Sequence, residues 1–283
     1  MKELRNQIRI IGFETGIFLL AQLIALFVGI RLLSFGAREA AMIQSTGAGV
    51  GMFVGALALS TIFIILLIKF FNSRFIFQLI FAWLIFIGSL TVFEVTIGEP
   101  LAMTFAVLLV VLRFLKPVVL LQNIAMVIAI GGIAPQLAMF FSTPTLIVVL
   151  IVASFYDYIA VFKTKHMVKL FEGLVKHNIP FTLVIPDKGS LFQKMHSGIH
   201  RSSERGREFY LLGTGDVAFP AVFAISVLAD FGPMASLLVV IGSLIGLLFD
   251  HYLLMKLQRP IPALPTIAAF SLLGFAAYFI GVI

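Results

Sequence analysis

The chain has 283 residues, of which 61% are hydrophobic and 12% charged, and its formal net charge is +7. A soluble domain would carry about twice that share of charged residues, so the composition excludes an ordinary soluble enzyme and indicates an integral membrane protein. Cysteine is absent, which excludes disulfides and thiol chemistry. In a membrane protein, positive charge orients the chain and meets anionic lipid, so we expect a bilayer and no nucleic acid as partner.

Nine apolar segments are predicted to be membrane-spanning helices, and none shows the alternation of a membrane barrel. Six spans occupy about residues 11–162, a polar loop occupies about 163–208, and three spans occupy about 209–283. No internal repeat and no separate soluble domain is present. We therefore predict one all-α polytopic membrane domain over residues 1–283.

The basic residues predict the orientation of this domain. In a nine-span chain, 18 of the 20 Lys and Arg fall on the side of the N-terminus and the long loop, and only Arg31 and Arg38 fall on the other. The positive-inside rule then places the N-terminus and the loop in the cytoplasm and the C-terminus outside. Glu14 in the first span and Asp250 and His251 in the eighth are expected to reach the headgroups.

Two aspartates lie inside apolar segments, where a carboxylate is costly and is by default functional. Asp157 precedes Lys163 by six residues, or about 9 Å of helix rise. Asp216 follows Arg207 by nine residues, or about 13 Å of rise. Since the two spans run in opposite directions, both carboxylates are predicted to lie at a similar depth in the cytoplasmic half of the bilayer.

Two neighbouring carboxylates in a low-dielectric site share one proton, because both cannot ionise cheaply. That state suits amide hydrolysis: the ionised member takes a proton from water, and the protonated member supplies one to the substrate. This reaction requires no cofactor and no metal, and the histidines of the chain lack the spacing of a zinc site.

Other residues near the aspartates are candidates for supporting the site. Gly213 and Gly215 would let a substrate backbone approach Asp216. Tyr156, beside Asp157, either hydrogen-bonds within the site or anchors its helix at the interface, and the sequence leaves both interpretations open. The last span opens with three prolines in six residues, which predicts an irregular start with unpaired carbonyls. Such backbone is tolerated at membrane depth only beside protein or water.

These motifs together resemble the presenilin and signal peptide peptidase family of intramembrane aspartyl proteases. The resemblance rests on Tyr156-Asp157 in the sixth span, Gly213-Thr214-Gly215-Asp216 in the seventh and Pro262-Ala263-Leu264 in the ninth. It implies nine spans and Asp157 and Asp216 as catalytic residues, with Pro262, Ala263 and Leu264 supporting the site and contacting substrate.

The same resemblance bears on subfamily and partners. The residues after Asp216 are more like signal peptide peptidase, whereas the inferred orientation is more like presenilin. The absence of cysteine and the compact loop are most like the archaeal presenilin homologues, which implies a multi-pass protein of a prokaryotic cell membrane. Its expected substrates are single-span membrane proteins or remnant signal peptides. No obligatory partner subunit is expected, and a homo-oligomer stays open.

Within the loop, residues 181–185 are bounded by Pro180 and Pro186 and are predicted to form a short strand. Phe181, Leu183 and Ile185 are candidates for substrate binding, because an unwound substrate can pair with a strand by strand addition. The alternative is a strand paired within the loop, with residues 209–211.

A proton-coupled transporter or channel is the alternative function, since intramembrane aspartates and broken helices serve there too. Transporters often show paired broken helices in two halves. In this chain all the polar features of this kind lie in the second half, which favours the protease.

Overall fold

The computed structural model describes residues 2–36, 55, 59, 74–160, 162, 182–186, 191–193, 209–257 and 261–282. Within these ranges it contains eight helices and a two-stranded sheet. The helices are α1 (Lys2–Ser34), α4 (Arg74–Ile97), α5 (Leu101–Leu115), α6 (Val119–Phe140), α7 (Thr143–Ile159), α9 (Thr214–Phe231), α10 (Pro233–Leu257) and α11 (Leu264–Val282). The strands are β1 (Thr182–Pro186) and β2 (Phe209–Gly213).

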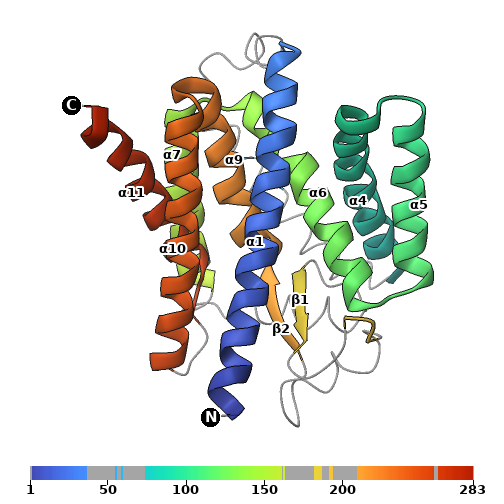
Figure 1. Cartoon of the computed structure of the whole chain (residues 1–283), viewed down its shortest axis with the longest axis horizontal. Helices are drawn as coiled ribbons and strands as arrows, with labels where there is room; N and C mark the ends of the chain where they lie inside the picture. The colour runs from blue at the N-terminus through green and yellow to red at the C-terminus, as the bar shows by residue number, and fades with distance from the viewer. Residues whose placement is uncertain are drawn as a thin grey trace.

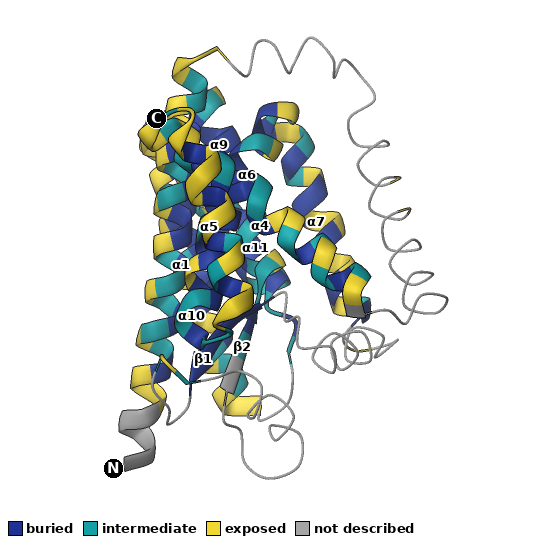
Figure 2. Cartoon of the chain, turned by 90° about the vertical axis from the view of Figure 1, so that its right-hand side faces the viewer, coloured by how far each residue is buried: buried dark blue, intermediate teal, exposed yellow. Residues whose placement is uncertain are grey.

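Helix α1 runs the height of the molecule, with α4 and α5 on one side of it and α7, α10 and α11 on the other (Figure 1). The sheet lies near the end of the molecule that carries the N-terminus. Helices α6 and α9 contact each other and α1, and they join the two groups of helices. Figure 2 shows the result, with buried residues concentrated in the middle and exposed residues on the outer faces.

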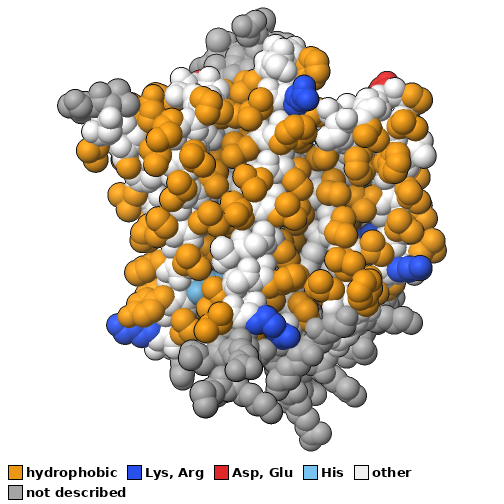
Figure 3. All heavy atoms as spheres, in the orientation of Figure 1, with side chains coloured by type: hydrophobic (Ala, Val, Ile, Leu, Met, Phe, Trp, Pro, Cys, Tyr) orange, Lys and Arg blue, Asp and Glu red, His pale blue; other side chains and the backbone are white. Residues whose placement is uncertain are grey.

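The outer faces of the helices suit a lipid environment. Six helices are long and apolar enough to cross a membrane: α1, α4, α6, α9, α10 and α11. Helices α5 and α7 are apolar but shorter, at 15 and 17 residues. Hydrophobic side chains cover the face in Figure 3, and its charged side chains lie mainly toward its ends. A polytopic helical membrane protein is therefore confirmed, while the second predicted span, about residues 46–68, falls almost wholly outside the described residues.

Glycines let neighbouring helices approach closely at two places. A Cβ on Gly132 of α6 would overlap the backbone of Gly88 in α4. A Cβ on Gly242 of α10 would overlap the carbonyl of Phe270 in α11, and one on Gly274 would overlap that of Leu238. Small residues are favoured at such contacts, because helices in lipid associate through close packing rather than through the hydrophobic effect.

Helix α6 holds strand β1 through two buried amide side chains. Asn123 donates from Nδ2 to the carbonyl of Val184 at 2.7 Å and accepts the N–H of Val184 at 2.8 Å. Gln122 donates to the carbonyl of Thr182 at 3.1 Å and also accepts a hydrogen bond from the buried Arg113 of α5. The outer edge of β1 is thus paired with α6, since both backbone groups of Val184 face it.

The seventh span differs from its prediction at its start. Residues 209–213 are strand β2 and pair antiparallel with β1, with Val184 opposite Leu211, so the helix begins at Thr214 and the prediction of a helix from Phe209 was wrong. The reason is the long-range partner: β1 offers its second edge to a segment whose last residue, Gly213, has an extended backbone (φ −61°, ψ 136°). The alternative of a strand paired with residues 209–211 is confirmed.

Candidate active site

Asp157 lies in the last turn of α7, and its residue is only 8% exposed. Its carboxylate accepts a hydrogen bond from the backbone N–H of Leu264, at the start of α11. The two preceding residues, Pro262 and Ala263, are not helical, so the chain enters α11 through an irregular segment with a buried proline. The Pro262-Ala263-Leu264 motif therefore contacts Asp157 through a backbone N–H.

Asp216 lies in the first turn of α9, directly after strand β2. Its carboxylate accepts a hydrogen bond from the backbone N–H of Gly213. A Cβ on Gly213 would lie 2.7 Å from Oδ2 of Asp216, so the missing side chain leaves room for the carboxylate. A carboxylate is also favoured here because the N-terminus of a helix carries a partial positive charge.

The fold brings the two aspartates together from different helices. The carboxylates of Asp157 and Asp216 lie close enough to interact electrostatically. Each lies at the end of its helix that is nearer the sheet: Asp157 ends one helix, and Asp216 begins the other. The two carboxylates were predicted to lie at a similar depth, and their meeting at these helix ends agrees with that prediction.

The other predicted site residues are placed differently. Tyr156 is 43% exposed, which fits interfacial anchoring better than a place in the site. Gly215 is exposed, and a Cβ there would meet only the ring of Phe219, at 3.9 Å. Phe181 lies outside the described residues.

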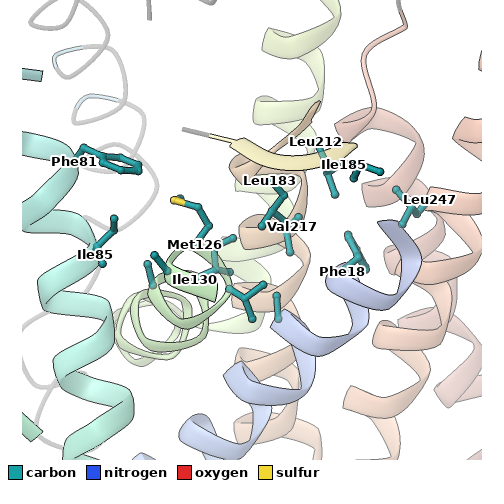
Figure 4. Close-up of a cluster of buried hydrophobic side chains, with 14 of the residues drawn as sticks. Phe18, Phe81, Ile85, Met126, Ile130, Leu183, Ile185, Leu212, Val217 and Leu247 are labelled. Carbon is teal, nitrogen blue, oxygen red and sulfur yellow. The ribbon is translucent and has the colours of Figure 1, made fainter. Parts of the chain in front are cut away.

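Leu183 and Ile185 point into the core rather than toward the surface. Both side chains are fully buried beside Leu212, Val217 and Leu247, as Figure 4 shows. They fasten the sheet to α9 and α10, so their side chains are not free to contact a substrate.

Three ionisable residues near the dyad, which were expected to reach the headgroups, lie largely inside the protein. Glu14 of α1 and Asp250 of α10 are 8% and 9% exposed, and His251 bonds Glu14 with Nε2 and Oε2 2.8 Å apart. Asp216 interacts electrostatically with both Asp250 and Glu14. Their position inside apolar segments was visible in the sequence. Their mutual contact could not be predicted, because it joins residues 237 apart in the sequence.

The arrangement of the dyad can support general acid and base catalysis. Two interacting carboxylates, each steadied by one backbone N–H, can hold one proton and activate a water between them. A carboxylate pair of this kind needs no side-chain nucleophile, because the water attacks the carbonyl directly.

Comparisons with known proteins identify the family and agree with the fold. The family profile described as "Signal-peptide peptidase, presenilin aspartyl protease" matches residues 15–283. Two solved structures of a presenilin family intramembrane aspartate protease, in space groups C222 and P2, are similar in fold. The first has a TM-score of 0.62 and 20% identity, covering 93% of this chain and 94% of that chain. The second has a TM-score of 0.61 and 22% identity, covering 91% and 95%. No curated protein matches the chain.

Proposed function

The chain belongs to the signal peptide peptidase and presenilin family of intramembrane aspartyl proteases, and we propose that Asp157 and Asp216 are its catalytic pair. The observation that carries this assignment is that the two carboxylates interact with each other and that Asp157 also accepts the backbone N–H of Leu264. Three segments from distant parts of the sequence converge there, and they are the three motifs that predicted the site.

The proposed reaction is hydrolysis of a peptide bond by an activated water. The ionised aspartate takes a proton from the water as it attacks the carbonyl carbon, while the protonated aspartate donates to the carbonyl oxygen. A tetrahedral gem-diol forms, and it collapses as the amine leaves with a proton. Each aspartate accepts one backbone N–H, so this contact favours neither one as the base, and the roles can exchange within a cycle.

We infer that a substrate strand adds to the outer edge of β2. Backbone groups along a strand face alternate sides. The backbone N–H and carbonyl of Val184 face α6, so those of its neighbour Leu183 face β2. The backbone groups of Leu212, the partner of Leu183, then face β1. Leu211 then directs its N–H and its carbonyl to the other edge, two residues before Gly213. A strand added there would lead an unwound substrate toward Asp216.

A proline at Leu211 tests this edge. Leu211→Pro removes the outward N–H, and proline is tolerated on an edge strand. We expect the KM for a single-span substrate to rise at least several-fold with little change in kcat, whereas Leu211→Ala keeps the N–H and the parent KM. Unchanged KM in the proline variant would contradict pairing at β2.

Substrates, orientation and surroundings complete the proposal. We place nine spans in the bilayer, with the N-terminus and the long loop in the cytoplasm and the C-terminus outside, because of the distribution of Lys and Arg. The substrates are single-span membrane proteins or remnant signal peptides. The protein acts in a prokaryotic, archaeal-like cell membrane without an obligatory partner subunit, as a monomer or a homo-oligomer.

The function is tested with a single-span substrate and the purified protein in liposomes. Mass spectrometry should find products cut within the apolar segment. A peptide with a hydroxyl-bearing carbon in place of the scissile carbonyl should inhibit strongly, because it resembles the gem-diol intermediate. Cuts confined to residues outside the apolar segment, or no inhibition by this peptide, would contradict the mechanism.

A further inference from the structure

A second cluster of ionisable side chains lies beside the dyad and is not used in the hydrolysis described above. Its members are Glu14 of α1 and Asp250 and His251 of α10, all buried or nearly so. No three His, Asp or Glu side chains in the described ranges converge as metal ligands, so a metal site does not explain the cluster.

The contacts of His251 fix how many protons the Glu14–His251 pair holds. Its Nδ1 lies 2.9 Å from the carbonyl oxygen of Leu247, which can only accept, so Nδ1 carries a hydrogen. Its Nε2 lies 2.8 Å from Oε2 of Glu14. One proton must lie between these two atoms, either on an imidazolium facing a carboxylate or on a carboxylic acid facing a neutral ring. In both forms the pair has no net charge.

Asp250 interacts with both this neutral pair and the dyad. One of its carboxylate oxygens, Oδ1, is buried and has no hydrogen-bond partner among the described residues. Asp250 interacts electrostatically with His251 and Glu14 of the cluster. It also interacts electrostatically with both dyad members, Asp157 and Asp216. A buried oxygen without a partner is costly, which indicates a function for this side chain.

The charged groups that face Asp250 come from each helix packed around it. Helix α1 supplies Glu14, α9 supplies Asp216 and α7 supplies Asp157, while α11 has no charged residue in its sequence. Four carboxyl groups in an apolar surrounding cannot all ionise, so they compete for few protons. The charge of Asp250 and the pair therefore affects whether the dyad keeps its shared proton.

We propose that Asp250 and the Glu14–His251 pair are positioning residues that keep the Asp157–Asp216 dyad in its singly protonated, reactive state. The negative charge of Asp250 makes loss of the shared proton less favourable. His251 neutralises Glu14, so the surroundings of the dyad do not become more negative. This inference rests on the proposed catalytic role of the dyad, and it adds residues that do not touch the substrate.

The inference predicts shifts of opposite sign in the pH profile of kcat. Asp250→Asn removes a carboxylate, and Glu14→Gln leaves the imidazolium of the ion-pair form without its carboxylate, so each makes the cluster more positive. The dyad should then lose its proton at lower pH, and the high-pH limb should move down on the order of one pH unit. His251→Gln leaves Glu14 without its cation and should move the same limb up. Asp250→Glu should restore the parent limb.

A matched control lies on the same two helices. Gln22 of α1 donates to Ser243 of α10 at 3.1 Å, eight residues along each helix from the Glu14–His251 contact. Ser243→Ala removes this buried bond and changes no charge, so both limbs should stay in place. If Asp250→Asn does not fold, the opposite shifts of Glu14→Gln and His251→Gln carry the test.

The outcomes separate this inference from the function itself. If the parent protein does not cleave, the proposed function fails. If the parent cleaves and no variant moves the high-pH limb, or if all three move it in the same direction, the proton-holding role is overturned while the dyad stands. Opposite shifts with an unmoved Ser243→Ala control support the inference, because loss of packing alone would lower the rate without that pattern.

Discussion

Leu264 contributes to the site through its backbone, and this decides how the third motif can be tested. Its N–H is donated to Asp157, and its side chain is 5% exposed and lies in the core. A hydrogen bond to a charged group is worth about 1.5–3 kcal/mol. The backbone and side-chain contributions can therefore be separated by substitution.

Leu264→Pro removes the N–H at a helix start where proline is tolerated, while Leu264→Ala keeps the N–H and loses packing. We expect kcat to fall roughly 10- to 100-fold in the proline variant, the kinetic equivalent of the lost hydrogen bond. The alanine variant should lose stability and keep most of its kcat. Cleavage rates at saturating substrate check this, and equal kcat values in the two variants would contradict the backbone role.

Gly213 and Gly215 form a matched pair on either side of the strand-to-helix junction. In Gly213→Ala the new Cβ would lie 2.7 Å from Oδ2 of Asp216 and displace a carboxylate that the same residue holds through its N–H. Gly215→Ala has room, with its nearest neighbour at 3.9 Å. We expect kcat to drop at least tenfold in the first variant and to persist in the second. A parent-like kcat for Gly213→Ala would show that the carboxylate does not depend on this space.

At the scale of elements, the two catalytic helices are tied together at the ends opposite the dyad. Helix α7 has no capping side chain of its own at Ser142. Instead Oδ2 of Asp230, near the end of α9, accepts the backbone N–H of Thr143 at 3.0 Å and its hydroxyl at 2.6 Å. One carboxylate thus caps α7 and fixes it to α9, which holds the direction of both helices.

Replacing Asp230 should therefore destabilise the protein. Loss of a cap costs about 1–2 kcal/mol, so Asp230→Ala should lower the midpoint of thermal unfolding by roughly 2–8 °C. Asp230→Asn keeps an acceptor oxygen and should lose less. Scanning calorimetry of the purified variants in one detergent compares them, and an Ala variant that melts with the parent would rule out the cap.

The elements also show how far the sequence could predict this fold and site. Apolar length predicted α4, α6 and α10 closely, because a bilayer requires helices of that length. Asp157 and Asp216 were found because a carboxylate in an apolar segment is costly. Strand β2 was predicted only as an alternative to the start of the seventh span, because its apolar residues continue into the helix and its pairing depends on β1, which Asn123 holds across 61 residues of sequence. Contacts of that range leave no local pattern.

At the scale of the whole molecule, the chain offers a direct test of its proposed orientation because it has no cysteine. Single cysteines can be placed at Ser197 in the long loop and at Glu99 between α4 and α5. In sealed vesicles from cells, a membrane-impermeant thiol reagent should reach the two positions from opposite sides, with Ser197→Cys on the cytoplasmic side. Labelling of both from the same side would contradict the nine-span arrangement.

The central claim is that Asp157 and Asp216 together hydrolyse peptide bonds within the membrane. The most direct measurement is cleavage of a single-span substrate in liposomes by the parent, Asp157→Asn and Asp216→Asn, with all three shown to melt alike. We predict that the parent cuts within the apolar segment and that each variant loses at least roughly a thousandfold in rate, because neither carboxylate alone supplies both an acid and a base. Parent-like cleavage by either folded variant would contradict the account.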